Sequence, residues 1–117
     1  MRTFMALIVK FALTLGAAAI AGALAGTIDW GLIFMLGLIG TIVNYLVGDL
    51  LILPATGNIV ASIADGGLAG LLAYFFAVRN TAFAGSVFMF ALAFGLIVMV
   101  AEFVFHMYLK KDEKVAP

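Results

Sequence analysis

Six polar side chains lie within or at the margins of long hydrophobic runs, where they could bind a cation or move a proton. These side chains are Lys10, Asn44, Asp49, Asp65, Glu102 and His106. Ionisable groups are costly at membrane depth and commonly mark ion pathways, proton relays or helix contacts. Three carboxylates here accompany one lysine and one histidine. In a medium of low dielectric, Lys10 alone cannot balance three ionised carboxylates. Either His106 is protonated, or one carboxyl keeps a proton, or a cation or water completes the cluster.

Other kinds of chemistry find little support in the sequence. The absence of cysteine excludes thiol catalysis, disulfides and cysteine-ligated metal sites. One histidine and six scattered methionines give little basis for a copper or haem site. No nucleophile with a matching base and no metal quartet is recognisable. We therefore predict that the protein is not an enzyme and has no cofactor or resident metal.

The composition indicates which kind of scaffold must position these groups. Of 117 residues, 67% are hydrophobic and 10% are charged, with a formal net charge of +0. Soluble domains have about 45–50% apolar and about 25% charged residues, so a soluble protein is excluded. Disorder is excluded by the same apolar content, and nucleic-acid binding by the lack of a basic stripe. We expect one transmembrane domain over residues 1–117, with the lipid bilayer as its main partner.

Four apolar runs are long enough to cross a bilayer as helices. They cover residues of about 4–26, 30–53, 59–78 and 82–109, and a charged tail follows at 110–117. About 20 apolar residues span the hydrocarbon layer. Short links make sequence neighbours antiparallel, so we predict an all-α integral membrane protein, an up-down bundle of four helices. The first run is too long for a signal peptide and contains Lys10, so we expect it to remain uncleaved.

The basic residues and the links predict the orientation and the helix ends. The basic residues on one side of the membrane are Arg2, Lys10, Lys110, Lys111 and Lys114, whereas Arg79 lies on the other side. This bias predicts that both termini and the link near Pro54 are cytoplasmic. We expect Asp29, Asn58 and Thr81 to cap the helices that follow them, and Pro54 to end the second helix.

The charged groups within the spans are expected to lie at one depth. Lys10, Asp49, Asp65 and Glu102 fall on four different helices, all roughly 6–10 Å below the same boundary at a rise of about 1.5 Å per residue. One interpretation is a structural cluster that fixes helix packing. The other is a channel or transporter in which the three acids bind an ion and Lys10 adjusts their charge.

Small residues form stripes along the predicted helices, including one on which Asp65 lies. The stripes include Ala18, Gly22 and Gly26; Gly37, Thr41, Asn44 and Gly48; Ala61, Ala69, Ala73 and Ala77; and Ala91 and Gly95. Close packing of helices in membranes relies on such residues. We predict that the stripes pack helices within one chain, with a homodimer contact as the alternative.

Two segments flanking the link at Pro54 resemble a known family. They read G-D-L-L-I-L-P over residues 48–54 and G-N-I-V-A-S-I-A-D over residues 57–65, and V-K-F-A-L-T over residues 9–14 also fits. The sequence resembles the YndM-like family, small four-span membrane proteins of endospore-forming Gram-positive bacteria with no known function. The resemblance implies a four-helix fold in the bacterial plasma membrane. It marks Gly48, Asp49, Pro54, Asn58 and Asp65 as motif positions and implies no activity or cofactor.

Two other classes of small four-span proteins fit poorly. Small multidrug transporters carry a glutamate in the first span, where this sequence has Lys10 and no acid. Fluoride channels use a G-T-x-x-x-N element, whereas residues 40–44 read G-T-I-V-N. We therefore predict a structural or accessory membrane protein of unknown function, with a proton- or cation-linked channel or transporter as the alternative. A homo-oligomer or a membrane-complex partner is compatible with either role.

Overall fold

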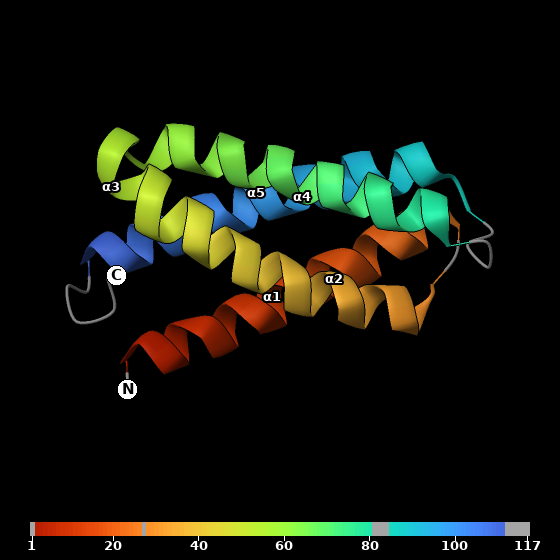
Figure 1. The fold of residues 1–117 in the computed structure, drawn as a ribbon, viewed down its shortest axis with the longest axis horizontal. Helices are drawn as coiled ribbons and strands as arrows, with labels where there is room; N and C mark the ends of the chain where they lie inside the picture. Colours follow the sequence, from red (N-terminus) through yellow and green to blue (C-terminus); the bar gives the residue numbers. More distant parts are fainter. Residues whose placement is uncertain (1, 27, 81–84, 112–117) are drawn as a thin grey trace.

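The computed structural model describes residues 2–26, 28–80 and 85–111, and it is helical almost throughout. The elements in chain order are α1 (Arg2–Ala25), α2 (Trp30–Val43), the π-helix η1 (Asn44–Ile52), α3 (Leu53–Thr56), α4 (Asn58–Arg79) and α5 (Val87–Lys111). Figure 1 shows that α1 begins and α5 ends at the same end of the molecule. We call this end the terminal end, and the opposite one the link end.

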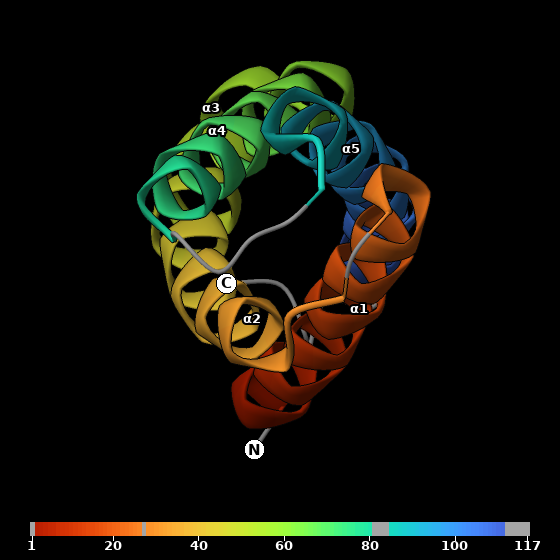
Figure 2. The same cartoon turned by 90° about the vertical axis from the view of Figure 1, so that its right-hand side faces the viewer.

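The four long segments form an antiparallel bundle. Seen along its length, they surround a common axis in the order α1, α2, α4, α5 (Figure 2), so the first and last helices are neighbours. Four helices are long and apolar enough to cross a membrane, and the described residues contain no strand. The prediction of an all-α, four-span membrane protein is confirmed. The side of the membrane that the terminal end faces stays a prediction.

The second helix ends differently from the sequence prediction. The backbone passes from α2 through η1 and α3 as far as Thr56, so Pro54 does not end the helix. Pro54 lies in the four-residue α3, which follows η1 directly. The chain reverses at Gly57, whose φ of 92° suits glycine.

The prediction that Asn58 caps the third span is wrong. Gly57 occupies the cap position of α4, and no side chain caps that helix. The Asn58 side chain instead donates from Nδ2 to the carbonyl oxygen of Phe103 in α5, at 3.0 Å. The amide therefore connects two helices rather than ending one.

At the link end, the predicted cap at Asp29 is confirmed. Its Oδ1 accepts a hydrogen bond from the backbone N–H of Leu32 at 3.2 Å. Its Oδ2 accepts a second bond from Asn80 Nδ2 at 2.7 Å, so the first and third links are tied together.

The last helix begins at Val87 rather than at residue 82. Ser86 precedes it, and the Ser86 Oγ accepts a hydrogen bond from the Met89 N–H at 3.1 Å. The cap predicted at Thr81 lies outside the described residues. A serine cap at this position satisfies a backbone donor that the helix itself cannot.

Apolar side chains form two separate clusters along the bundle. The larger one fills the middle and the link-end half, with Leu36, Phe90 and Phe94 among its buried members. The smaller one, Ala6, Ala61 and Phe105, lies toward the terminal end. Along each long helix, the buried polar residues fall between these two clusters or at the border of the larger one.

Glycine allows α4 and α5 to pack closely. A Cβ atom added to Gly66 would lie 2.8 Å from the carbonyl oxygen of Gly95, and one added to Gly95 would lie 2.8 Å from that of Gly66. Both positions therefore require glycine. These small residues pack helices within the chain, as the sequence predicts.

Candidate functional site

The buried polar residues of the bundle form one layer, which we call the polar layer. Its members are Lys10, Thr14, Thr41, Asn44, Ser62, Asp65 and Glu102. None is more than 4% exposed. Every long helix contributes at least one of these residues.

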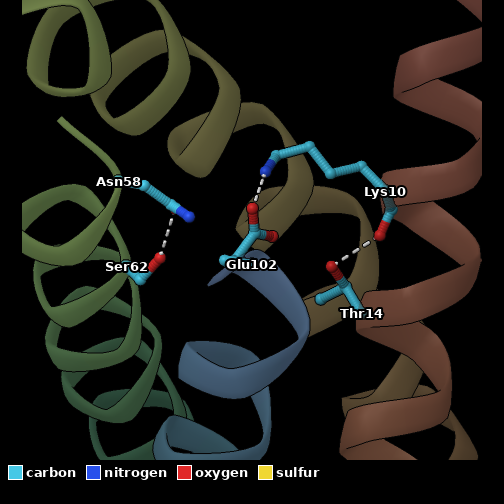
Figure 3. A network of polar contacts seen from close by, with 5 residues as sticks. All are labelled: Lys10, Thr14, Asn58, Ser62 and Glu102. Atoms are coloured by element: carbon cyan, nitrogen blue, oxygen red, sulfur yellow. Dashed lines mark hydrogen bonds and ion pairs between the residues drawn. The ribbon is translucent and has the colours of Figure 1, made fainter. Parts of the chain in front are cut away.

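The central contact of the polar layer is an ion pair between the first and last helices. Lys10 Nζ donates to Glu102 Oε1 across 92 sequence positions, and both side chains are almost fully buried (Figure 3). The same ammonium group lies 4.9 Å from the ring centroid of Phe105, which allows a cation–π interaction. The positive charge thus contacts a carboxylate and the negative face of an aromatic ring.

Two of the three hydroxyl groups of the layer, those of Thr14 and Ser62, are engaged within their own helices. Thr14 Oγ1 donates to the carbonyl oxygen of Lys10 at 2.7 Å, and Ser62 Oγ donates to Asn58 Oδ1 at 3.0 Å (Figure 3). Asn58 also donates to the backbone of α5, so its amide links Ser62 to that helix. Of these contacts, the bond from Asn58 joins α4 to α5, and the hydroxyl groups bond to a carbonyl and an amide rather than to a base.

Asp65 lies directly against the backbone of Gly48. The aspartate is fully buried, and a Cβ atom added to Gly48 would overlap its carboxylate, with Asp65 Cγ only 2.8 Å away. Any larger residue at position 48 would displace the carboxylate. The two halves of the sequence motif, which are separated by the link, therefore meet in space.

Thr41 and Asn44 present polar atoms to the interior at the junction of α2 and η1. Both are buried, and Thr41 Oγ1 and both amide atoms of Asn44 have no hydrogen-bond partner within the part of the chain that the structure describes. The nine-residue π-helix begins at Asn44. Short π-helical segments inside α-helices occur frequently at functional sites.

Three members of the polar layer were absent from the predicted site. Thr14, Thr41 and Ser62 are short hydroxyl residues that many transmembrane helices contain, so their type alone carries little signal. Their spacing was informative, because residues three or four apart lie on the same face of a helix. Thr14 lies four residues from Lys10, Thr41 lies three residues from Asn44, and Ser62 lies three residues from Asp65.

Two predicted members cannot be placed in the same way. The backbones of Asp49 and His106 belong to η1 and α5, but their side chains lie outside the described part of the structure. Their participation in the polar layer stays a prediction. Among the described residues, no group of three or more histidines, cysteines or acids could hold a metal ion.

Comparisons with known proteins identify relatives but no activity. A family profile described as a protein of unknown function, DUF2512, matches residues 1–116. The chain is also 43% identical over 70 residues to the uncharacterized membrane protein YndM of Bacillus subtilis (strain 168). That match covers 60% of this chain and 39% of the relative, so it spans less than half of the relative's length. No solved structure matches the chain.

Proposed function

The chain belongs to the DUF2512 family and has four helices able to span a membrane, and from this premise we propose that it is a non-enzymatic structural or accessory protein of the membrane. The family description names no reaction, so the proposal depends on the geometry of the polar layer. The observation that carries it is the buried ion pair between Lys10 and Glu102. This pair fixes the first helix against the last.

The main effect of a buried ion pair of this kind is to favour one arrangement of the helices over the others. Removing two charges from water costs about as much as their attraction returns, but removing one partner leaves a charge in a medium of low dielectric. Helix arrangements that separate Lys10 from Glu102 are therefore strongly disfavoured. Phe105, whose ring centroid lies 4.9 Å from the ammonium group of Lys10, packs with Ala6 and Ala61 in the smaller apolar cluster.

The remaining contacts of the polar layer also support a structural role. The hydroxyl groups of Thr14 and Ser62 bond to a backbone carbonyl and to an amide. The carbonyl and amide oxygens that accept these two bonds are not bases that could activate a hydroxyl as a nucleophile. We propose that the ion pair and the Asn58 bond hold the helices in place, and that chemistry, where needed, comes from a partner protein in the membrane.

The proposal is tested by replacing the ion pair with apolar groups of similar length. In the double variant Lys10→Met with Glu102→Met, no buried charge is left without a partner, so we expect the thermal unfolding midpoint in detergent to return close to the wild-type value. The single variant Lys10→Met should unfold at a much lower temperature. Circular dichroism at 222 nm measures both.

The same preparations separate the structural role from ion transport. Wild-type protein in liposomes is expected to leave imposed pH and sodium gradients unchanged. Rapid loss of either gradient, stopped by Glu102→Gln, would contradict the structural proposal and favour a channel or transporter. A double variant less stable than both single variants would contradict the ion pair as the structural contact.

A further inference from the structure

A pocket with two charged side chains lies at the link end, between the start of α2 and the end of α4. It has a volume of about 510 Å³, and the two helices are neighbours around the bundle (Figure 2). Its lining combines polar and apolar side chains, those of Asp29, Arg79 and Asn80 and those of Leu32, Met35 and Phe76. Pockets for small ligands commonly have volumes of about 300–1,000 Å³, with a few polar groups on an apolar lining.

The ends of two spans place this pocket at the surface of the membrane. The second span begins at Trp30, and the third ends at Arg79. The headgroups of a bilayer lie directly outside its hydrocarbon layer, which is about 30 Å thick. Trp30 directly follows Asp29 and is 61% exposed, as is typical of aromatic residues at the interface. The pocket therefore lies at the level of the lipid headgroups in the leaflet at the link end.

The cation of the pocket is held in place by an aromatic ring. The guanidinium carbon of Arg79 lies 4.0 Å from the ring centroid of Phe75, one turn earlier in α4. The Arg79 side chain is exposed, and it forms no ion pair within the part of the chain that the structure describes. A guanidinium group presents paired donors that match two oxygens of a phosphate. Arg79 is therefore positioned to bind a phosphate that enters the pocket from the membrane surface.

The anion of the pocket is the half-buried carboxylate of Asp29. It accepts one hydrogen bond from the Leu32 N–H and another from Asn80 Nδ2, and these two bonds fix its position. A carboxylate has about four acceptor sites, so a further donor can bind. Hydrogen bonds between a carboxylate and a cationic donor are about twice as strong as neutral ones, so an ammonium group is the donor that suits this position.

The two charges together determine the ligand. A phosphate alone would be attracted by Arg79 and repelled by Asp29, whereas a headgroup with both a phosphate and an ammonium group complements both. We propose that the pocket binds a zwitterionic phospholipid, phosphatidylethanolamine, whose ammonium group keeps its hydrogen-bond donors. The phosphate contacts Arg79, the ammonium group contacts Asp29, and the glycerol end of the lipid lies on Met35 and Phe76. This site is separate from the polar layer, so the structural proposal does not depend on it.

The proposal is tested by adding lipids to protein that has been freed of copurified lipid in detergent. The thermal unfolding midpoint of the full-length chain is followed by circular dichroism at 222 nm. A lipid that binds the folded state raises this midpoint with increasing concentration. With equal acyl chains, we expect the largest rise with phosphatidylethanolamine, a smaller one with phosphatidylglycerol, which lacks the ammonium group, and the smallest with diacylglycerol, which lacks both charges. Equal responses to the three lipids would overturn the proposal.

Two variants assign the response to the two charges. Arg79→Gln removes the cation at an exposed position, and the concentration of phosphatidylethanolamine that gives half of the response should rise on the order of tenfold, the equivalent of about 1.4 kcal/mol. Asp29→Ser removes the carboxylate but keeps a side chain that caps α2, and it should abolish the preference for phosphatidylethanolamine over phosphatidylglycerol. An unchanged half-response concentration in the first variant, or an unchanged preference in the second, would contradict the proposed contacts.

Matched controls are available for the protein and for the ligand. Arg2→Gln makes the same chemical change at the start of α1, at the terminal end, and should keep the full response. Soluble phosphoethanolamine carries the same two charged groups without acyl chains, and it should leave the midpoint unchanged at the concentrations used for the lipid. A response lost in Arg2→Gln would mean that the lipid responds to overall charge, and an equal rise with phosphoethanolamine would mean that the ligand is not a lipid. Either result would overturn the proposal.

Discussion

Two contacts join distant parts of the chain, one toward each end of the bundle. Lys10 and Glu102 meet deep in the polar layer, between α1 and α5. Asp29 and Asn80 meet at the link end, where both are only partly buried. Both contacts bridge elements that are remote in sequence, but only the first has no water to replace a lost partner. The comparison teaches that burial, rather than the type of bond, determines what each contact contributes.

The largest difference is expected when the same chemical change is made at both ends. Glu102→Gln leaves Lys10 with a buried charge and a weaker acceptor, so we expect a loss of about 3–5 kcal/mol in the free energy of unfolding. Asp29→Asn keeps an effective helix cap and should cost less than about 1 kcal/mol. Chemical unfolding in mixed micelles, followed by circular dichroism, measures both. Equal losses at the two sites would contradict the conclusion that burial determines what each contact contributes.

A second test concerns the tight contact that supports Asp65. Gly48→Ala places a methyl group where the Asp65 carboxylate lies, and we expect a loss of about 1–3 kcal/mol in the free energy of unfolding. Gly67→Ala is the matched control, because a Cβ atom at that exposed helical position meets nothing within 4 Å. It should be neutral or stabilising by up to about 1 kcal/mol. A tolerated Gly48→Ala would show that the carboxylate can move away at little cost.

The smallest expected effect lies at the link end. Asp29→Ala removes the cap of α2 and the bond from Asn80, and we expect a loss of about 1 kcal/mol, because water can reach the freed groups. Asp29→Ser should restore most of this loss, since serine also caps helices well. The thermal midpoints of the two variants give the comparison. A loss as large as that of Glu102→Gln would mean that water is excluded from the link end as it is from the polar layer.

Much of the fold was predictable because it depends on local features. Four long apolar runs with few charges indicate four spans in any arrangement, and the short links make neighbouring spans antiparallel. The cap at Asp29 was predictable for the same reason, since a cap depends only on residues within one turn. The family resemblance around Gly48 and Asp65 was also readable from the sequence, and the family match supports it.

The ends of the second span show where local rules fail. Pro54 is a strong signal for a helix end, yet the chain continues through η1 and α3 to Thr56. Asn58 is a good cap by type, but its amide bonds across to α5 instead. For Asn58, the neighbouring helix α5 competes with the local preference, and that helix is not visible in the segment itself.

The sequence by itself determined that the chain is a membrane protein and how many spans it has, because hydropathy is a property of each segment. It also predicts a common depth for the charged groups within the spans, from the helical rise. Only the tertiary structure decided that α1 is next to α5, that Lys10 therefore bonds to Glu102, and that Gly48 makes room for Asp65. Depth fixes one coordinate of a side chain. Its partner depends on how the helices are ordered around the bundle and how each is rotated, and these follow from the packing of all four helices together.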